Sequence, residues 1–590
     1  MQPIDYAIIV AYLVGLVWIG VRLQRKASEG IESYFLGNRS IPWWALGASG
    51  MATNLDVAGT MVIVALMYAL GIQGFYIEIR GGVVLIMAFL MVYMGKWNRR
   101  SQSMTVAEWM TFRFGTGRQG DSARALAAAA NLIFAIASVT YFAHGIGLFV
   151  GTLMGIPPEI ASLAMIGLAT AYTVASGLYG VVYTDLFQGV LIFFTLMYVT
   201  VHVFLNYSLP ETFSVSVPLL DGGFETIGTT LADWATWTPR ATMDVPGAYS
   251  QYNLLGMALA FYMLKVVIEG SGGAGGGHMV QRFFSSASDR EAGLISLLWT
   301  VLLAFRWPFI VSIAIMGISY GAANGVIANP EEVLPIVVMN LVPVGIKGLL
   351  VAGLVSAAMS TFDSTVNAAA AYWVRDIYQH FMKPLASEKA LLRQGRWASL
   401  LIVVLGVGLT YAFTSINDIW GWLTMGLSAG LMLPQVIRWY WWRFNGYGFA
   451  GSTLVGMVLA FGQKLFAPGL SEMASFGLIT ALTLASAVVI TLLTSPTPDD
   501  VLDGFFRTTR PFGIWGPVRR RLPAELVASI RAEGRRDLRA LLVAIPWQLV
   551  LFLAPMVLVL RQWGAFAMLL GLLAALSVLL YLAWYRHLGD

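Results

Sequence analysis

Long apolar runs separated by short polar stretches make up most of the 590-residue chain. About fifteen of these runs are long enough to cross a bilayer as a helix, which takes roughly 20 residues. Hydrophobic residues make up 58% of the chain and charged residues only 11%. The pattern therefore predicts an all-α polytopic membrane protein with about fifteen transmembrane helices and a lipid bilayer as its surroundings.

Basic residues are concentrated in every second loop between the apolar runs, whereas the longest loop on the opposite side, residues 206–250, contains only Arg240. This alternation places the N-terminus outside and the C-terminus in the cytoplasm. The N-terminal run follows no basic segment, so no cleavable signal peptide is expected. We expect a multi-pass protein of a bacterial-type inner (plasma) membrane, a monomer with a dimer as the alternative. The net charge of +5 comes from these loops and does not indicate a nucleic-acid partner.

One apolar run, residues 350–378, carries hydroxyl and small side chains where lipid would favour Leu and Ile. At helical spacing Ala357, Ser360, Thr361 and Ser364 share one stripe, with Asp363 beside it. Such a stripe suits close helix packing, since small residues and back-bonded hydroxyls allow helices to approach. Its oxygens also suit a hard monovalent cation, and both interpretations remain open from the pattern alone.

Two other runs are interrupted by polar residues and glycines. Residues 52–59 hold Asn54 and Asp56, and the seventh run holds Lys265 and Glu269 before a glycine-rich stretch at 270–277. Interrupted spans at corresponding positions of two halves are typical of the central site of a transporter. A plain i, i+4 ion pair between Lys265 and Glu269 and a glycine packing face are the structural alternatives.

Four motifs occur together in one order: GASGMATNLDVAGT, GLYGVVYTDLFQGV, GGHMVQRFFSSAS and VSAAMSTFDSTVNAAAAYWVRDIY. On these motifs, roughly residues 1–495 resemble the sodium:solute symporter family, which includes sodium/glucose, sodium/proline and sialic acid symporters. The resemblance implies a LeuT-type fold with two inverted five-helix repeats.

The resemblance also implies how the chain is divided. A leading transmembrane helix and cytoplasmic loop (1–43) precede the first repeat (44–205), an extracellular loop (206–250) and the second repeat (251–440). Two further helices (441–494), a basic cytoplasmic loop (495–539) and a C-terminal transmembrane hairpin (540–590) follow. The basic loop is expected to be solvated and to skim the membrane, with a regulatory contact as the alternative.

The shared sodium site of the family uses two carbonyls from the first broken core helix and a carbonyl and two hydroxyls from the eighth. Matched residue by residue, these are the carbonyls of Ala52, Leu55 and Ala357 and the hydroxyls of Ser360 and Thr361. The resemblance thus implies Na⁺ as the coupling ion.

A second sodium site in some members uses an aspartate on the fifth core helix, which matches Asp185. The implied fold would bring Asp363 and Ser364 to the same place, so that two carboxylates share it. A bound cation is favoured there, while a shared proton and pairing with a Lys or Arg are the alternatives.

Candidate substrate-binding residues are the polar and aromatic side chains of the interrupted spans and the family's sugar-contacting positions: Asn54, Asp56, Glu78, Lys265, Glu269, Arg306 and Trp422. The match at Arg306 needs a one-residue slip. Trp420, Gly421 and Trp422 occupy the region where sugar carriers have a glutamine.

Other classes lack their chemistry in this chain. A serine protease could start from the GASG turn at Ser49, but none of the five histidines can be paired with it. No HExxH, phosphate-binding loop or dinucleotide motif is present, and residues 495–540 are too short for a kinase. We therefore expect a transporter and not an enzyme: a sodium-coupled symporter for a sugar, sugar acid or polyol. A symporter for an amino acid or monocarboxylate, or a transporter-like sensor, is the alternative.

Overall fold

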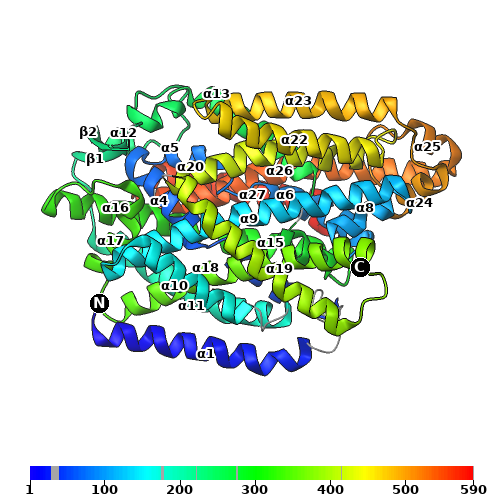
Figure 1. Cartoon of the computed structure of the whole chain (residues 1–590). Helices are drawn as coiled ribbons and strands as arrows, with labels where there is room; N and C mark the ends of the chain where they lie inside the picture. Colours follow the sequence, from blue (N-terminus) through cyan, green and yellow to red (C-terminus); the bar gives the residue numbers. More distant parts are fainter. Residues whose placement is uncertain (28–38, 174–177, 221, 274–276, 414, 589–590) are drawn as a thin grey trace.

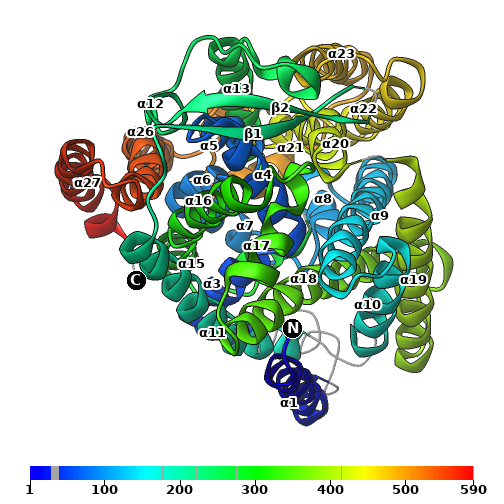
Figure 2. The same ribbon diagram turned by 90° about the vertical axis from the view of Figure 1, so that its left-hand side faces the viewer.

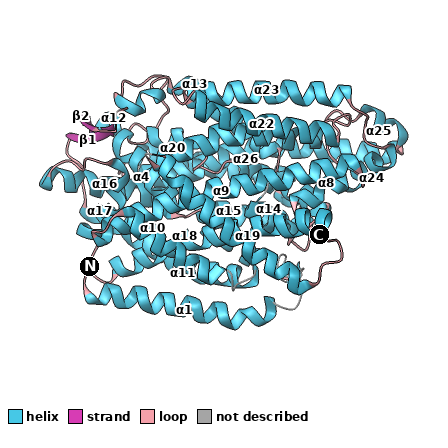
Figure 3. Ribbon diagram, viewed as in Figure 1, coloured by secondary structure: helices cyan, strands magenta, loops and turns pink. Residues whose placement is uncertain are grey.

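The computed structural model describes residues 1–27, 39–173, 178–220, 222–273, 277–413 and 415–588. Helices make up nearly all of it and run along one common direction (Figures 1 and 3). Within the described residues nine helices are long and apolar enough to cross a membrane, and a bent pair makes a tenth. The all-α polytopic architecture is confirmed. The count of about fifteen spans is not, because short 3₁₀ and π turns divide several apolar runs into helices below spanning length.

The helices before residue 210 are, in chain order, α1 (Pro3–Ala27), α3 (Trp43–Thr53), α4 (Val57–Leu70), α5 (Gln73–Ile77), η2 (Glu78–Arg80), α6 (Ile86–Phe89), η3 (Leu90–Met94), α7 (Gly95–Arg100), α8 (Val106–Phe114), α9 (Arg118–Met154), α10 (Pro158–Thr173) and α11 (Leu178–Asn206). Next come β1 (Thr212–Pro218), β2 (Phe224–Thr230), α12 (Leu231–Trp234) and η4 (Gly247–Tyr252).

The remaining helices up to the second long loop are α13 (Leu255–Ser271), α14 (Gly277–Phe284), α15 (Asp289–Leu303), α16 (Arg306–Asn324), η5 (Pro330–Glu332), α17 (Val333–Leu341), α18 (Ile346–Ala371), η6 (Tyr372–Met382), α19 (Glu388–Leu409), η7 (Thr410–Ala412), α20 (Ile416–Gly421), η8 (Trp422–Leu427), α21 (Ser428–Tyr440), α22 (Gly446–Phe466) and α23 (Glu472–Leu493). The chain ends with α24 (Asp499–Thr509), α25 (Gly516–Arg521), α26 (Ala524–Val559), α27 (Trp563–Ala583) and η9 (Tyr585–His587).

Helix α4 lies at the centre of the bundle, and α1 and α27 lie at its edge (Figure 2). Every residue of α4 is buried, whereas only Leu569 and Leu580 of α27 are. Both helices are apolar all round, so burial in protein explains α4 and contact with lipid acyl chains explains α27. The polar break before α4 therefore lies inside the bundle and not at its lipid-facing edge.

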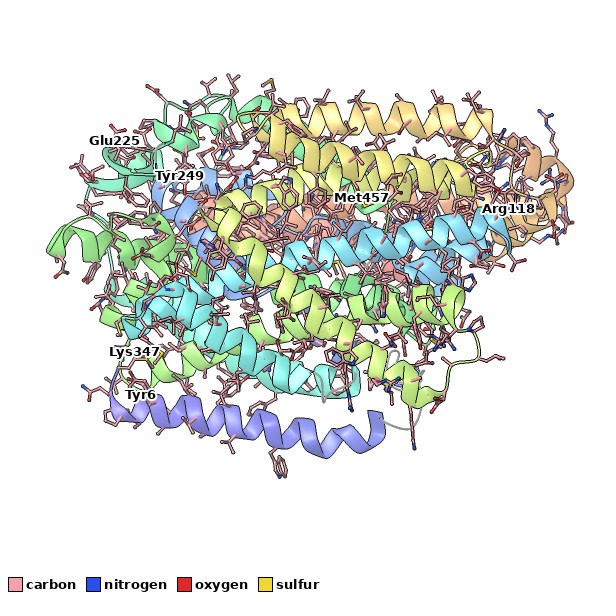
Figure 4. The ribbon with its side chains drawn as sticks, viewed as in Figure 1. Tyr6, Arg118, Glu225, Tyr249, Lys347 and Met457 are labelled. Atoms are coloured by element: carbon pink, nitrogen blue, oxygen red, sulfur yellow. The ribbon has the colours of Figure 1, made fainter. Side chains whose placement is uncertain are left out.

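A β-hairpin marks one end of the bundle, which we call the hairpin end (Figures 1 and 4, where Glu225 and Tyr249 are labelled). Strands β1 and β2 pair antiparallel from Thr212↔Thr230 to Pro218↔Phe224. The alternating Val and Ser residues of β1 explain why this part of the expected loop, residues 206–250, forms a strand. It is the one departure from an all-helical chain among the described residues.

The opposite end carries α24, α25 and the start of α26, with Arg118 nearby, and we call it the arginine-rich end (Figures 1 and 4). The segment 495–539, expected from the sequence to be a solvated loop that skims the membrane, contains helices, and its residues Phe505, Phe506 and Trp515 are buried. The guanidinium of Arg113 lies 5.0 Å from the ring centre of Phe505 and 5.1 Å from that of Trp515. Moreover, α26 begins at Ala524 and continues without a break into the expected C-terminal hairpin.

Candidate functional site

The second apolar run is a broken helix, as its polar residues predict. Helices α3 and α4 meet at a bend of 58° across residues 54–56. The side chain of Asp56 accepts a hydrogen bond from the N–H of Gly59 at 2.7 Å and so caps the N-terminus of α4. A cap supplied by the chain itself allows the helix to stop and restart inside the bundle, which leaves backbone carbonyls of α3 available to other groups.

Helix α18 faces this break with the hydroxyl stripe expected from its sequence. The Oγ1 of Thr361 lies 2.8 Å from the carbonyl of Thr53 and 2.9 Å from that of Ala357, and its single proton can serve one of them at a time. The N–H of Leu55 donates to the carbonyl of Ala52 at 3.2 Å. Part of the expected shared sodium set thus gathers between the end of α3 and the middle of α18.

Ser360, next to Thr361, joins this place to Asp185 on α11. Its hydroxyl donates to the buried carboxylate of Asp185, which also accepts a hydrogen bond from Ser49 at 2.5 Å. The guanidinium of Arg282 on α14 lies 3.4 Å from Asp185 and 2.9 Å from the Ser49 hydroxyl. Arg282 follows the seventh apolar run in the sequence, yet it is buried and paired here.

Asp363 and Ser364, the other residues of the expected second sodium site, are also buried on α18. The Oγ of Ser364 has no hydrogen-bond partner among the described residues. Of the arrangements considered for Asp185, pairing with an arginine is the one that the structure contains.

A central cavity of about 240 Å³ lies beside the break and between α9, α13, α18 and α21. Among the expected substrate residues, Asn54, Asp56, Lys265 and Glu269 line it. Lys265 and Glu269 form the i, i+4 ion pair considered from the sequence, with 2.5 Å between Nζ and a carboxylate oxygen. The centre of the glycine run, residues 274–276, lies outside the described part of the chain.

The other expected substrate residues lie apart from the central cavity. Glu78 is buried and its carboxylate accepts hydrogen bonds from Arg80 at 3.0 Å and from the Nε1 of Trp420 at 3.2 Å. Arg306 is buried and does not line the central cavity, and one of its Nη atoms lies 3.5 Å from the Oγ1 of Thr60. Trp422 lines a different cavity and donates to the carbonyl of Ala460 at 3.3 Å.

This second cavity, of about 1,080 Å³, lies at the hairpin end and is lined by residues of the β1–β2 turn, η4, α20, η8 and α23. Arg80 is completely buried. Its neighbour Gly81 lines the central cavity, and its partners Asn417 and Glu472 line the second cavity. Its guanidinium donates to Glu78, to Glu472, to the Oδ1 of Asn417 at 2.6 Å and to the hydroxyl of Tyr252 at 2.8 Å. These bonds tie η2, η4, α20 and α23 together.

Glu331, in η5 of the loop between α16 and α17, holds the start of α20. Its carboxylate accepts hydrogen bonds from the N–H groups of Asn417 at 2.9 Å and Ile416 at 3.2 Å. Burial raises the pKa of Glu331 from 4.5 to about 7, against the lowering effect of these two N–H groups. A folded pKa above the unfolded value means that the folded protein binds this proton more tightly.

The contribution of Glu331 to folding stability is therefore fully present below pH 4.5 and is lost as the pH rises to about 7. The unfolding temperature of the native protein should rise when the pH is lowered from about 8 to about 6, and Glu331→Gln should lose that component. Glu332→Gln is the matched control in the same turn. An unchanged pH slope in Glu331→Gln would contradict the assignment.

The chain is similar to known proteins. A family model described as the sodium:solute symporter family matches residues 34–457. The chain is 26% identical over 491 residues to sodium/glucose cotransporter 4 of Danio rerio, covering 78% of this chain and 71% of the relative. It is 25% identical over 548 residues to a sodium/glucose cotransporter of Vibrio parahaemolyticus (86% and 94% covered) and 24% identical over 506 residues to the sodium/sialic acid symporter SiaT of Proteus mirabilis (83% and 94% covered).

Among solved structures, the substrate-bound outward-open state of a Na⁺-coupled sialic acid symporter superimposes with a TM-score of 0.63 at 18% sequence identity. The match covers 84% of this chain and 99% of that chain. At this identity the likeness concerns the fold, and the expected LeuT-type fold is confirmed.

Proposed function

We propose, from the premise that this chain belongs to the sodium:solute symporter family, that it imports a neutral polyhydroxylated solute, a sugar or a polyol. Sodium is the coupling ion in this family, and the relatives are transporters and not enzymes. The solute class and the residues that bind solute and sodium are the proposal.

The charge of the central cavity supports a neutral solute. Among the described residues that line it, Lys265 is positive while Glu269 and Asp56 are negative. Arg306, which lies near Asp56, cancels the remaining negative charge. An anionic solute would then add an uncompensated charge in a poorly hydrated place, which is costly.

The relatives include carriers named for glucose, for myo-inositol and for mannose, all neutral polyhydroxylated rings. They also include a sialic acid symporter, so a sugar acid is the second candidate. Lys265 would have to leave Glu269 to meet a carboxylate, and the 2.5 Å pair argues against that exchange.

The proposed shared sodium site consists of the carbonyls of Ala52, Leu55 and Ala357 and the hydroxyls of Ser360 and Thr361. Sodium held there would fix the end of α3 against α18, and α3 leads directly into the break that lines the cavity. Each ligand would then bind more tightly when the other is present, and the coupling is reciprocal by thermodynamic linkage. This supplies the coupling that alternating access requires.

We further propose a second sodium site at Asp185, Asp363 and Ser364. The arginine-rich end would face the cytoplasm and the hairpin end the outside of a bacterial-type inner membrane, with a monomer as the functional unit. The clustering of basic residues in alternate loops supports this orientation, and Figure 1 agrees in drawing the two termini towards opposite ends.

Sodium-gradient-driven uptake into proteoliposomes tests the proposal, with D-glucose, D-mannose, myo-inositol, sialic acid and proline as solutes. Thr361→Ala removes a proposed sodium ligand, so the sodium concentration for half-maximal uptake should rise at least about tenfold, equivalent to roughly 1.4 kcal/mol. Thr200→Ala is the matched control, because Thr200 is also buried and bonds only the carbonyl of Leu196 in its own helix. Equal sodium dependence in the two variants would refute the shared site, and uptake of proline alone would refute the solute class.

A further inference from the structure

The hydroxyl of Tyr141 on α9 lies unpaired in the wall of the central cavity. The residue is 2% exposed, lines the cavity, and its Oη has no hydrogen-bond partner among the described residues. Its ring stacks on that of Trp420, with 5.2 Å between ring centres and 27° between planes. A buried hydroxyl without a partner carries a free-energy cost, so a ligand group that pairs with it would recover that cost.

Two further polar groups converge on the same place around Gly59. A Cβ atom at Gly59 would lie 2.9 Å from the Oη of Tyr141, 3.0 Å from the Oδ2 of Asp56 and 3.1 Å from an Nη of Arg306. The other carboxylate oxygen of Asp56 accepts the N–H of Gly59, and the Nε of Arg306 has no partner in the described part of the chain. Any side chain at residue 59 would fill the space that these groups share.

We propose that Tyr141 and Asp56 form a hydroxyl-recognition subsite that determines which polyhydroxylated ring the transporter accepts, with the indole of Trp420 as part of its wall. One hydroxyl of the solute donates to the Oδ2 of Asp56, and a neighbouring hydroxyl accepts from the Oη of Tyr141. The guanidinium of Arg306 converges on the same place and offers the ionised, accepting form of Asp56 an opposite charge. This inference rests on the proposed function, since it assigns residues to that solute class.

The donor and acceptor types explain why the subsite would select hydroxyl groups in a defined arrangement. Asp56 is only an acceptor when ionised, and Tyr141 supplies a donor that no protein group uses. A solute that lacks one of the two hydroxyls would leave a buried polar group unpaired, and sites of this kind discriminate strongly against such analogues. Tyr76 contrasts with Tyr141, because its hydroxyl donates to the carbonyl of Trp237 at 2.5 Å.

Tyr141→Phe tests the subsite because it removes only the hydroxyl and keeps the stacked ring. Uptake is measured with D-glucose and myo-inositol and with their single-deoxy analogues in the native protein and the variant. For the transported parent, KM should rise about tenfold in Tyr141→Phe, while one deoxy analogue should show the same KM in both proteins. The unfolding temperature of the solute-free variant should be unchanged, because the lost hydroxyl has no partner there.

Gly59→Ala provides the second, steric test, with Gly167→Ala on α10 as the control because nothing lies within 4 Å of a Cβ atom there. Gly59→Ala should lose solute-induced thermal stabilisation, while Gly167→Ala should keep it. An equal loss for every deoxy analogue, or a lowered unfolding temperature of solute-free Tyr141→Phe, would overturn the subsite while the proposed function stands. Absence of uptake of every neutral polyol by the native protein would overturn the proposed function itself, and the subsite with it.

Discussion

Replacement of Asp185 by asparagine should lower the free energy of unfolding by about 3 to 5 kcal/mol, because it removes the carboxylate that faces the buried guanidinium of Arg282. Both side chains are at most 1% exposed, so water cannot compensate. The measurement is thermal or chemical unfolding of the purified protein. Asp418→Asn, which breaks the exposed ion pair with Lys464, should cost about 1 kcal/mol or less.

The double variant Asp185→Asn/Arg282→Gln separates the ion pair from the proposed second sodium site. Removal of both charges should restore much of the lost stability, since no charge is left without its partner. Sodium coupling should remain impaired if Asp185 also binds sodium, because the carboxylate is still missing. Full recovery of coupling in the double variant would show that Asp185 acts only as the partner of Arg282.

Substitution of Arg80 by glutamine is expected to have an effect of similar size, about 3 to 5 kcal/mol, because Glu78 and Glu472 would remain close together without their shared cation. We expect the bonds of Arg80 to act also as a barrier between the two cavities, so sodium-independent solute leak should increase in Arg80→Gln. Leak is measured as solute efflux from proteoliposomes without sodium. Arg240→Gln removes an exposed arginine paired with Asp233 at 2.6 Å and is the matched control.

Equal stability and equal leak in Arg80→Gln and Arg240→Gln would contradict the role of Arg80 as the link across the barrier. Loss of stability without leak would assign Arg80 to folding alone. Increased leak with a stable fold would assign it to the barrier alone. Each outcome separates packing of the hairpin end from control of access to the central cavity.

The broken helix and the hydroxyl stripe were predictable because their signals are local. Asp56 caps the helix that begins at the next residue, and Ser360 and Thr361 stand out against an apolar run. Helical periodicity also assigns them to a face. Such a local signal does not depend on which helices pack around it. The structure contains both the broken helix and the hydroxyl stripe.

Arg282 and Arg80 show where such prediction ends. Arg282 follows an apolar run, where the alternation of basic loops predicts an exposed charge, but it is buried and its partner is Asp185, far away in the sequence. Arg80 meets groups from four separate elements, and nothing in its neighbourhood indicates Glu472. A charged residue inside an apolar stretch signals that a partner exists, but only the fold identifies it.

Trp420 and Trp422 show a smaller limit of the same kind. Two residues in a helix point about 200° apart, so one lines the central cavity and the other the cavity at the hairpin end. Trp422 is the solute-binding residue expected from the sequence, while Trp420 is the residue that contacts both Glu78 and Tyr141. The sequence does not predict which of the two side chains faces the central cavity, because a π-helical turn begins at Trp422 and changes the helical periodicity.

The packing of Arg113 against Phe505 and Trp515 has a consequence for how the chain is made. About 400 residues separate the arginine from these rings. At a synthesis rate of roughly 5 to 20 residues per second, the rings are therefore made about 20 to 80 seconds after the arginine. During that interval Arg113 lacks the packing of Phe505 and Trp515, while the chain is already entering the membrane. A segment made late in synthesis therefore covers an arginine that lies in the first third of the chain.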